Sequence, residues 1–207
     1  MQGVNYNDLL ELLKIALIAY LIGSIPTGYI VVKLFKGQDI REVGSGSTGA
    51  TNVKRVMGKY WFFAVMLLDA FKGFAPVFIT KNVSYAYIDW GLAPVIAALF
   101  VLIGHSKPIF LGFKGGKSVA SGVGTIFALN WQIGAIIAAI WGIITYLSKY
   151  VSLGSIIALG LSPVLMILFN QPVFYTAYCA ISAAYVIYLH RENIIRLLEG
   201  KENKVRD

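Results

Sequence analysis

Charged residues and cysteines are both scarce in this chain. Only 14% of the 207 residues are Asp, Glu, Lys or Arg, whereas 57% are hydrophobic and the mean hydropathy is +0.71. A soluble domain carries about a quarter charged residues, so this composition excludes a soluble protein and indicates an integral membrane protein. The single cysteine, Cys179, lies in an apolar run and cannot form an internal disulfide, so the fold does not depend on an oxidising compartment.

Several familiar sequence signals are also missing. No polar linker is long enough to divide the chain, so we expect one membrane domain over residues 1–207. No cluster of His, Cys, Asp and Glu has the spacing of a metal site, and no cofactor motif is present. The net charge of +8 does not indicate nucleic acid, because the basic residues lie in short loops between apolar runs. We therefore expect no metal, no cofactor and no nucleic-acid partner.

Apolar runs of membrane-spanning length cover most of the chain. Polar or turn-forming residues at Asn130, Ser148–Ser152 and Asn170–Pro172 divide the long apolar region in the second half. The expected spans are Leu9–Leu34, Trp61–Ile79, Trp90–Gly104, 118–129, 131–148, 151–169 and 172–189.

The distribution of Lys and Arg sets the expected number of crossings. Most of them lie in polar stretches around residues 33–59, 107–117, 149 and 191–206, which the positive-inside rule places in the cytoplasm. An even number of crossings must then separate residues 117 and 190. We predict an all-α polytopic protein with seven transmembrane helices, its N-terminus outside and its C-terminus cytoplasmic. Treating 118–148 and 151–189 as single crossings gives five, the alternative.

The first polar cluster is IREVGSGSTGATNVKRVMGK, at residues 40–59. Glycines let the backbone approach a ligand closely, and the planar fork of Arg suits phosphate oxygens. Arg55 follows Asn52 by three residues, so on a helix they share a face. We expect an anion-binding loop that uses Ser45, Ser47, Asn52 and Arg55; a flexible solvated loop is the alternative.

The second cluster is Lys114-Gly115-Gly116-Lys117-Ser118, which immediately precedes an apolar stretch. At the start of a helix, free backbone N–H groups and the positive end of the dipole create an anion site. Leu111 stands where a nucleotide-binding GxxxxGK[ST] loop needs Gly, so we expect phosphate binding without ATP. His105 stands shortly before this loop, and a lone histidine is more often structural than catalytic.

The third cluster is HRENIIRLLEGKENK, at residues 190–204. His190, Asn193 and Arg196 recur every three residues and form one polar face of a helix leaving the bilayer. An amphipathic tail bound to anionic lipid would explain the Arg and Lys residues, but it explains His190 and Asn193 less well.

Two ionisable residues lie within a predicted span. Asp69 and Lys72 are three residues apart in LLDAFKG, and we expect them to pair inside the bundle because charges are costly in lipid. The sequence leaves open whether this pair is structural or functional. Ser152 and Ser155, at another cytoplasmic turn, could face the same site.

The segments GSGSTGATNVKR, GHSKPIFLGFKGGKSVA and HRENIIRLLEGKE, with DAFKG between them, resemble the acyl-phosphate:glycerol-3-phosphate acyltransferases (PlsY type) of bacterial phospholipid synthesis. The resemblance covers the whole chain. It implies transfer of an acyl group from acyl phosphate to the 1-hydroxyl of glycerol 3-phosphate, giving lysophosphatidic acid without coenzyme A or acyl carrier protein. It also implies a bacterial plasma (inner) membrane location, with the active site at the cytoplasmic face.

The resemblance further implies roles for individual residues. The family's motif serine and arginine fall on Ser45 and Arg55, its phosphate-loop glycines on Gly115 and Gly116, its motif histidine and asparagine on His190 and Asn193, and a structurally important glutamate on Glu202. The chain departs from the family at two positions: Ser47 stands where Asn is frequent, and Ser118 where Gly is common.

An acyl phosphate is already activated, so positioning and charge neutralisation can suffice without a covalent intermediate. We expect direct attack by the glycerol hydroxyl while Arg55, Lys114 and Lys117 neutralise the two phosphates. Ser45 or His105 would orient the carbonyl or the leaving group.

The general base is either His190 or the substrate's own phosphate, and the sequence leaves that choice open. A transporter for a phosphorylated anion and a non-catalytic assembly factor are the competing functions. The transporter would need a site near the bilayer midplane and an internal repeat, and no repeat is visible in the sequence.

Overall fold

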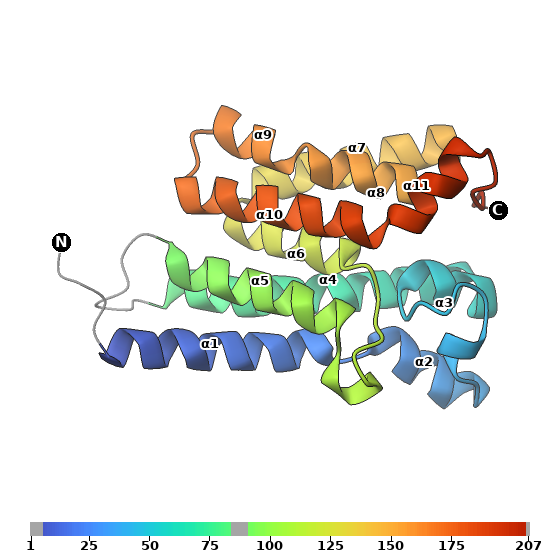
Figure 1. Ribbon diagram of the computed structural model, residues 1–207, viewed down its shortest axis with the longest axis horizontal. Coiled ribbons are helices and arrows are strands. Elements are labelled where there is room, and N and C mark those ends of the chain that lie inside the picture. Colours follow the sequence, from blue (N-terminus) through green and yellow to red (C-terminus); the bar gives the residue numbers. More distant parts are fainter. Residues whose placement is uncertain (1–5, 84–90, 206–207) are drawn as a thin grey trace.

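The computed structural model describes residues 6–83 and 91–205, and these residues form helices joined by short loops. Long helices lie side by side and the chain runs back and forth along the long axis (Figure 1). The elements are α1 Tyr6–Ser24, α2 Thr27–Lys36, η1 Ile40–Glu42, α3 Ala50–Met57, α4 Lys59–Asn82, α5 Leu92–Ser106, η2 Ile109–Leu111, α6 Val119–Leu129, α7 Trp131–Ser148, α8 Val151–Gly160, α9 Ser162–Leu168, α10 Val173–Leu189 and α11 Arg191–Leu198.

The chain turns where the sequence predicts breaks. Asn130 ends α6 and begins α7, and its side chain accepts hydrogen bonds from the N–H groups of Gln132 (3.0 Å) and Ile133 (3.1 Å). This is an N-cap, which satisfies donors that the first turn leaves unpaired. Residues 118–148 are therefore two helices rather than one continuous helix.

Two predicted spans are less regular than expected. The first is interrupted at Pro26, which has no N–H and disfavours helical backbone at the preceding residue, so it divides into α1 and α2. The span predicted over 151–169 divides into α8 and α9 at Leu161. The expected start of the third span, Trp90, lies outside the described residues.

Five helical stretches in the described chain are long and apolar enough to cross a membrane. A sixth is added if α10 and α11, which meet at 61°, form one bent span. Helix α6 has 11 residues, or about 16 Å at 1.5 Å per residue, roughly half of a bilayer's hydrocarbon thickness. The all-helical membrane architecture is thus confirmed, whereas the seven crossings and their orientation stay predictions.

Helix α6 lies between a layer of α1, α4 and α5 and a layer of α7, α8 and α10 (Figure 1). Its backbone touches that of α4: a Cβ on Gly124 would lie 2.0 Å from the Ala70 carbonyl oxygen. A Cβ on Gly73 would lie 2.2 Å from the carbonyl oxygen of Ser121. Small residues allow such close helix packing in membranes. The contact fixes the start of α6, and with it the preceding loop, relative to α4.

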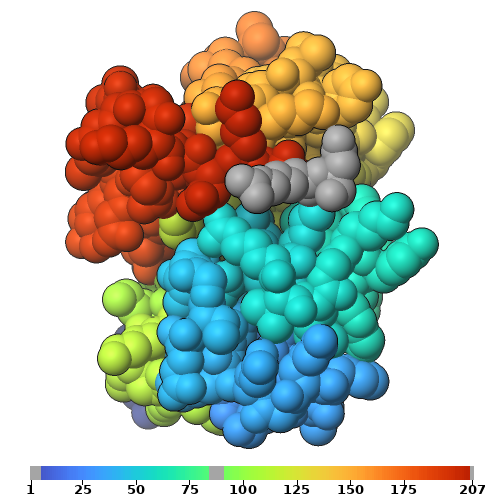
Figure 2. All heavy atoms as spheres, turned by 90° about the vertical axis from the view of Figure 1, so that its right-hand side faces the viewer, coloured from blue at the N-terminus to red at the C-terminus, as the bar shows by residue number. Residues whose placement is uncertain are grey.

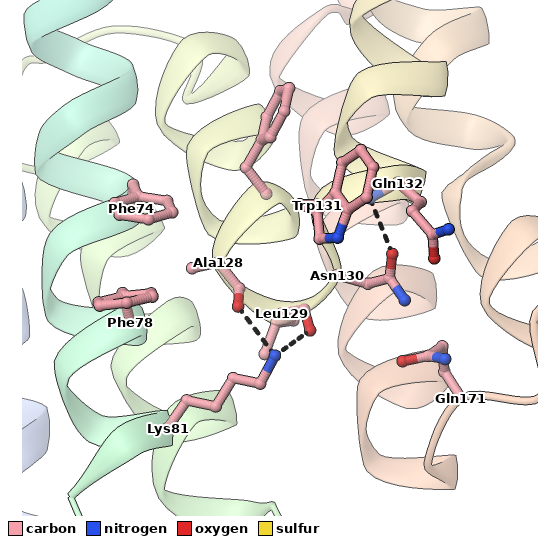
Figure 3. A pocket seen from close by; sticks show the side chains of 10 residues that line it. Phe74, Phe78, Lys81, Ala128, Leu129, Asn130, Trp131, Gln132 and Gln171 are labelled. Carbon is pink, nitrogen blue, oxygen red and sulfur yellow. Dashed lines mark hydrogen bonds between the residues drawn. The ribbon is translucent and has the colours of Figure 1, made fainter.

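The two ends of the bundle differ. We call the end that holds α2, α3, the loop 112–118 and α11 the polar end, and the opposite end the far end. At the far end, Lys81 donates hydrogen bonds to the carbonyls of Ala128 (3.2 Å) and Leu129 (2.6 Å), which close the last turn of α6 (Figure 3). A cavity of about 310 Å³ lies there beside Phe74 and Phe78, and no predicted site residue lines it.

Candidate active site

The first predicted loop is held from within by Asn52. This side chain, 1% exposed, donates hydrogen bonds to the carbonyls of Ile40 (3.2 Å), Val43 (2.9 Å) and Ser47 (2.9 Å). Its own oxygen accepts from the N–H of Ser45 at 2.9 Å. The amide is therefore fully occupied in shaping the loop, and its geometry supports a positioning role rather than the predicted contact with substrate.

The glycines on either side of Ser45 have conformations that suit glycine. Gly44 has φ 61° and Gly46 has φ 69°, both in the left-handed region. A Cβ on Gly44 would also lie 2.1 Å from the Asn52 side-chain oxygen. Between them, Ser45 is exposed at the polar end. The turn thus presents this hydroxyl to solvent.

The glycine loop before α6 packs against His105. The Gly116 N–H donates to the His105 carbonyl at 3.1 Å. A Cβ on Gly115 would lie 2.2 Å from that carbonyl oxygen, and a Cβ on Gly116 would lie 2.2 Å from His105 Nε2. Both positions therefore require glycine, and the imidazole lies buried beneath the loop.

Ser118 occupies a position whose backbone conformation favours glycine. It is the N-cap of α6 with φ 59°, a left-handed conformation that costs about 1–2 kcal/mol for residues with a Cβ. Its hydroxyl donates to the Leu102 carbonyl at 2.8 Å, which ties the start of α6 to α5. The bond offsets part of that cost.

Beneath the glycine loop lies the predicted intramembrane ion pair. Lys72 Nζ is 2.8 Å from Asp69 Oδ1, and both side chains are buried, so the expected pairing is confirmed. Lys72 also donates to the Ile25 carbonyl at 2.7 Å, at the break between α1 and α2. Thr27, just after that break, donates a hydrogen bond to Asp69.

The third cluster is organised by Glu202. Its carboxylate accepts hydrogen bonds from Asn193 (2.6 Å), Arg196 (2.7 Å) and Ser152 (2.9 Å). Lys117 of the glycine loop donates to the oxygen of Asn193. A continuous polar chain thus joins the second cluster, the third cluster and α8, three segments that are far apart in sequence.

The charges in this polar chain influence one another. Burial lowers the pKa of the Lys117 ammonium, and the neighbouring charges of Arg196 and Arg55 lower it further against the opposing charge of Glu202. Burial by itself would raise the pKa of Glu202, but hydrogen bonds from Asn193, Arg196 and Ser152 together outweigh it and lower that pKa. Arg55, Lys117 and Arg196, one cation from each cluster, are therefore close enough to interact electrostatically. The positive potential that they create together favours an anionic ligand.

His190 is held in a defined orientation at the end of α10. Its Nδ1 lies 2.8 Å from the Val186 carbonyl oxygen, which only accepts hydrogen bonds, so Nδ1 carries a proton. In the neutral ring, Nε2 then keeps its lone pair. Burial, with a smaller contribution from the charge of Lys117, lowers the pKa of His190 to about 4 against the opposing effects of the Val186 carbonyl and Glu202. The geometry leaves Nε2 as the ring nitrogen that can accept a proton, and the low pKa keeps the imidazole neutral at pH 7 but makes it a weak base.

The clusters converge on the polar end (Figure 2), where segments from residues 40–60 and 190–205 border the same face. A cleft of about 360 Å³ between the first two clusters is lined by Asp39, Arg41, Glu42, Gly46 and Lys114. Lys114 thus lies on the cleft side next to the Ser45 loop, whereas Lys117 faces the third cluster. His105 lies beneath them and does not join either group.

Sequence reasoning missed several polar residues of this region. Arg41 lines the cleft and points one guanidinium nitrogen at the Leu111 carbonyl, 3.4 Å away. The hydroxyl oxygen of Ser121, in the first turn of α6, lies 3.1 Å from His105 Nδ1. Thr27 was detectable as a hydroxyl directly after Pro26 in an apolar run, but nothing in the sequence pairs it with Asp69.

Comparison with known proteins gives one consistent result. A family model described as glycerol-3-phosphate acyltransferase matches residues 13–200. A glycerol-3-phosphate acyltransferase of Nostoc sp. is 42% identical over 204 residues, which covers 92% of this chain and 90% of the relative.

Two solved structures have the same fold. They are crystal structures of PlsY, an integral membrane glycerol 3-phosphate acyltransferase, in its glycerol 3-phosphate form (TM-score 0.88, 39% identity) and its lysophosphatidic acid form (TM-score 0.86, 36% identity). Each match covers 95% of this chain and 96% of the other. With three motifs at one end of an all-helical membrane bundle, the chain belongs to the glycerol-3-phosphate acyltransferase family of integral membrane enzymes.

Proposed function

We propose that this protein transfers a fatty acyl group from acyl phosphate to the 1-hydroxyl of glycerol 3-phosphate and releases lysophosphatidic acid and inorganic phosphate. Residues 1–207 act as one domain in a bacterial plasma membrane, with seven crossings and an outside N-terminus. The polar end faces the cytoplasm. The basic residues gathered at that end support this orientation by the positive-inside rule.

The contact between Lys117 and Asn193 carries the proposal. It joins the glycine loop to the helix that follows His190, and Arg55 lies close enough to influence the Lys117 charge. An acceptor phosphate and a donor phosphate both need cations and N–H groups, while the acyl chain needs an apolar surface nearby. The polar end supplies the cations and N–H groups, and the exposed apolar side chains of the bundle supply the apolar surface.

The proposed reaction is a direct transfer. The 1-hydroxyl oxygen of glycerol 3-phosphate attacks the acyl carbonyl carbon, the bond from that carbon to the phosphate oxygen breaks, and phosphate leaves with the electron pair. Arg55, Lys114 and Lys117 neutralise the two phosphates. The Gly115 N–H adds a neutral donor, and Gly116, whose N–H is bonded to the His105 carbonyl, lets the backbone approach the phosphate closely. The hydroxyl proton passes to His190 Nε2 or to a substrate phosphate oxygen.

The remaining predicted residues support this arrangement. Ser45 is exposed at the turn beside the cleft and orients the carbonyl or the leaving group, with Ser47 in the same loop. Asn193 shares its oxygen with Lys117, and Ser152 holds Glu202. Because the donor is activated by its own phosphate, neither coenzyme A nor acyl carrier protein takes part.

The test is an assay of the purified protein in lipid nanodiscs with palmitoyl phosphate and glycerol 3-phosphate, with lysophosphatidic acid measured by mass spectrometry. Palmitoyl-coenzyme A replaces the donor in a parallel reaction and should yield no product. Arg55→Ala removes a charged contact worth about 1.5–3 kcal/mol, so turnover at low substrate should fall at least tenfold. Lys36→Ala, an exposed cation at the end of α2, is the control and should retain activity.

The competing function is transport of a phosphorylated anion. Vesicles that contain the protein and receive labelled glycerol 3-phosphate separate the two functions. Uptake of label without lipid product would refute the acyltransferase proposal. An Arg55→Ala protein as active as wild type would exclude Arg55 from the site.

A further inference from the structure

His105 and Asp69 lie where four segments meet under the glycine loop. His105 Nδ1 is 3.6 Å from Asp69 Oδ1 of α4 and 3.1 Å from the Ser121 hydroxyl of α6. Asp69 in turn binds Lys72 and Thr27. All the polar groups of this cluster are thus fixed by one another, and the imidazole cannot turn without breaking contacts on two helices.

The arrangement resembles a Ser-His-Asp triad in composition but not in geometry. In a triad the carboxylate and the serine hydroxyl contact different ring nitrogens. Here both Asp69 and Ser121 lie at Nδ1 of His105, and Nε2 lies against Gly116. No proton relay can pass through the ring. His105 is 6% exposed, so it has little access to substrate.

His105 supports the glycine loop at two points, one on its backbone and one on the Nε2 edge of its ring. The His105 carbonyl accepts the Gly116 N–H at 3.1 Å, and the Nε2 edge lies where a Cβ of residue 116 would stand. Lys117, the next residue, reaches Asn193. A shift of the imidazole would therefore move Gly116 and displace the Lys117 ammonium relative to the third cluster.

We propose that Asp69 and His105 are positioning residues for phosphate binding. The buried carboxylate orients the imidazole, and the imidazole fixes the position of Gly116, and with it that of Lys117, relative to the third cluster. This inference rests on the proposed function, since the loop must bind a substrate phosphate. It assigns His105 to a role exerted through the loop and not to contact with the reacting atoms.

The free energy needed to bury the charges of this cluster is consistent with a positioning role. A buried ion pair is weak evidence for stability, because desolvation of both charges opposes their attraction. Here the pair is also connected to the α1–α2 break through Ile25 and Thr27. The connection makes the support under the loop rigid, because movement would leave a charge unpaired in the membrane.

The decisive experiment combines two substitutions. Gly116→Ala places a methyl group on the imidazole edge and should displace the loop by about 1 Å, which can cost on the order of a hundredfold in kcat/KM. His105→Ala removes the ring and should raise the KM for glycerol 3-phosphate or acyl phosphate, with kcat changed less than threefold. In the double variant the methyl group occupies the vacated space, so kcat/KM should recover at least tenfold over Gly116→Ala.

Tyr178→Phe is the matched control. It also removes a buried hydrogen bond, between Tyr178 and Thr125, but further along α6 and away from the loop. It should lower the melting temperature and leave both KM values unchanged. A buried polar group whose role is only structural would give this pattern, and His105→Ala should not.

Three outcomes would overturn the inference: no rescue in the double variant, a hundredfold loss of kcat in His105→Ala with unchanged KM values, or changed KM values in Tyr178→Phe. If Gly116→Ala does not fold, recovery of folded protein in the double variant reports the same contact, and failure to recover it refutes the contact. A wild-type protein that makes no lysophosphatidic acid would instead refute the proposed function.

Discussion

Replacement of Glu202 by Gln tests how the C-terminal segment is attached to the bundle. The carboxylate accepts hydrogen bonds from Ser152 of α8 and from Asn193 and Arg196 of α11. Gln has nearly the same shape but carries no charge, and its NH₂ group cannot accept a hydrogen bond. If the remaining oxygen keeps Ser152 and Asn193, the NH₂ group faces the Arg196 guanidinium, and that contact is lost.

The magnitude follows from the lost contact. A hydrogen bond to a charged group contributes about 1.5–3 kcal/mol. The Arg196 side chain is 35% exposed, so solvent screening favours the lower part of this range, about 1.5–2 kcal/mol. For a protein of 150–250 residues, 1 kcal/mol shifts the Tm by about 2–4 °C. We therefore expect the Tm of Glu202→Gln to fall by about 3–8 °C.

The measurement is thermal unfolding of the detergent-solubilised protein, followed by the acyltransferase assay. Glu199→Gln is the control, because Glu199 pairs with Lys201 across an exposed contact of 3.1 Å. Exposed ion pairs contribute about 0–1 kcal/mol, so the control should melt within about 2 °C of wild type. Glu202→Gln should also raise the KM for a phosphate substrate, since loss of the Arg196 contact loosens α11, the helix that carries Asn193.

Equal melting temperatures for the two variants would refute the reasoning. They would mean that the Glu202 carboxylate contributes no more than an exposed one. A lower Tm with unchanged KM values would show that Glu202 stabilises the tail but does not position Asn193.

Three further predictions concern pH, helix packing and helix capping. The folded-state pKa of Glu202 is lowered from 4.5, so the stabilisation by its carboxylate is present above pH 4.5 and is lost as the pH falls through the folded pKa. The Tm difference between wild type and Glu202→Gln should therefore shrink below pH 4.5. A constant difference would contradict this. Gly124→Ala should destabilise the protein by about 1–3 kcal/mol, because the added methyl group collides with the α4 backbone. Gly142→Ala, with open space around it, is the control and should be neutral or slightly stabilising. Equal effects of the two substitutions would argue against the α4–α6 contact. Lys81→Met should cost about 1 kcal/mol by uncapping α6 and leave KM values unchanged, so a raised KM would show that the far end is coupled to the site.

Helical organisation was predictable because it depends on local composition. Apolar runs bounded by Asn130, the turn near Ser148 and Pro172 marked helix boundaries that the structure reproduces within a few residues. Pro26 could be read in the sequence, but the break that it causes was not predicted, because the run around it is apolar enough to indicate one continuous span. The glycine motifs were equally local, since a left-handed φ at Gly44 or Gly46 is a property of the turn itself.

The partnerships within the site were not predictable from the sequence. Lys117 and Asn193 are 76 residues apart, and Ser152 and Glu202 are 50 apart, so only the packing of the helices brings these pairs together. The surroundings of Asn52 and His105 were not predictable either. Backbone carbonyls of the first loop surround the Asn52 amide, and Asp69, Ser121 and Gly116 surround the His105 imidazole.

By itself, the sequence determined that this is a helical membrane protein with three phosphate-suited motifs, because hydropathy, turn residues and glycine conformations act over a few neighbouring residues. The tertiary structure decided which polar groups remain available to a ligand and which support the loops. That distinction depends on distances across the bundle, which arise from close contact between helix backbones at Gly73 and Gly124 and from the break at Pro26.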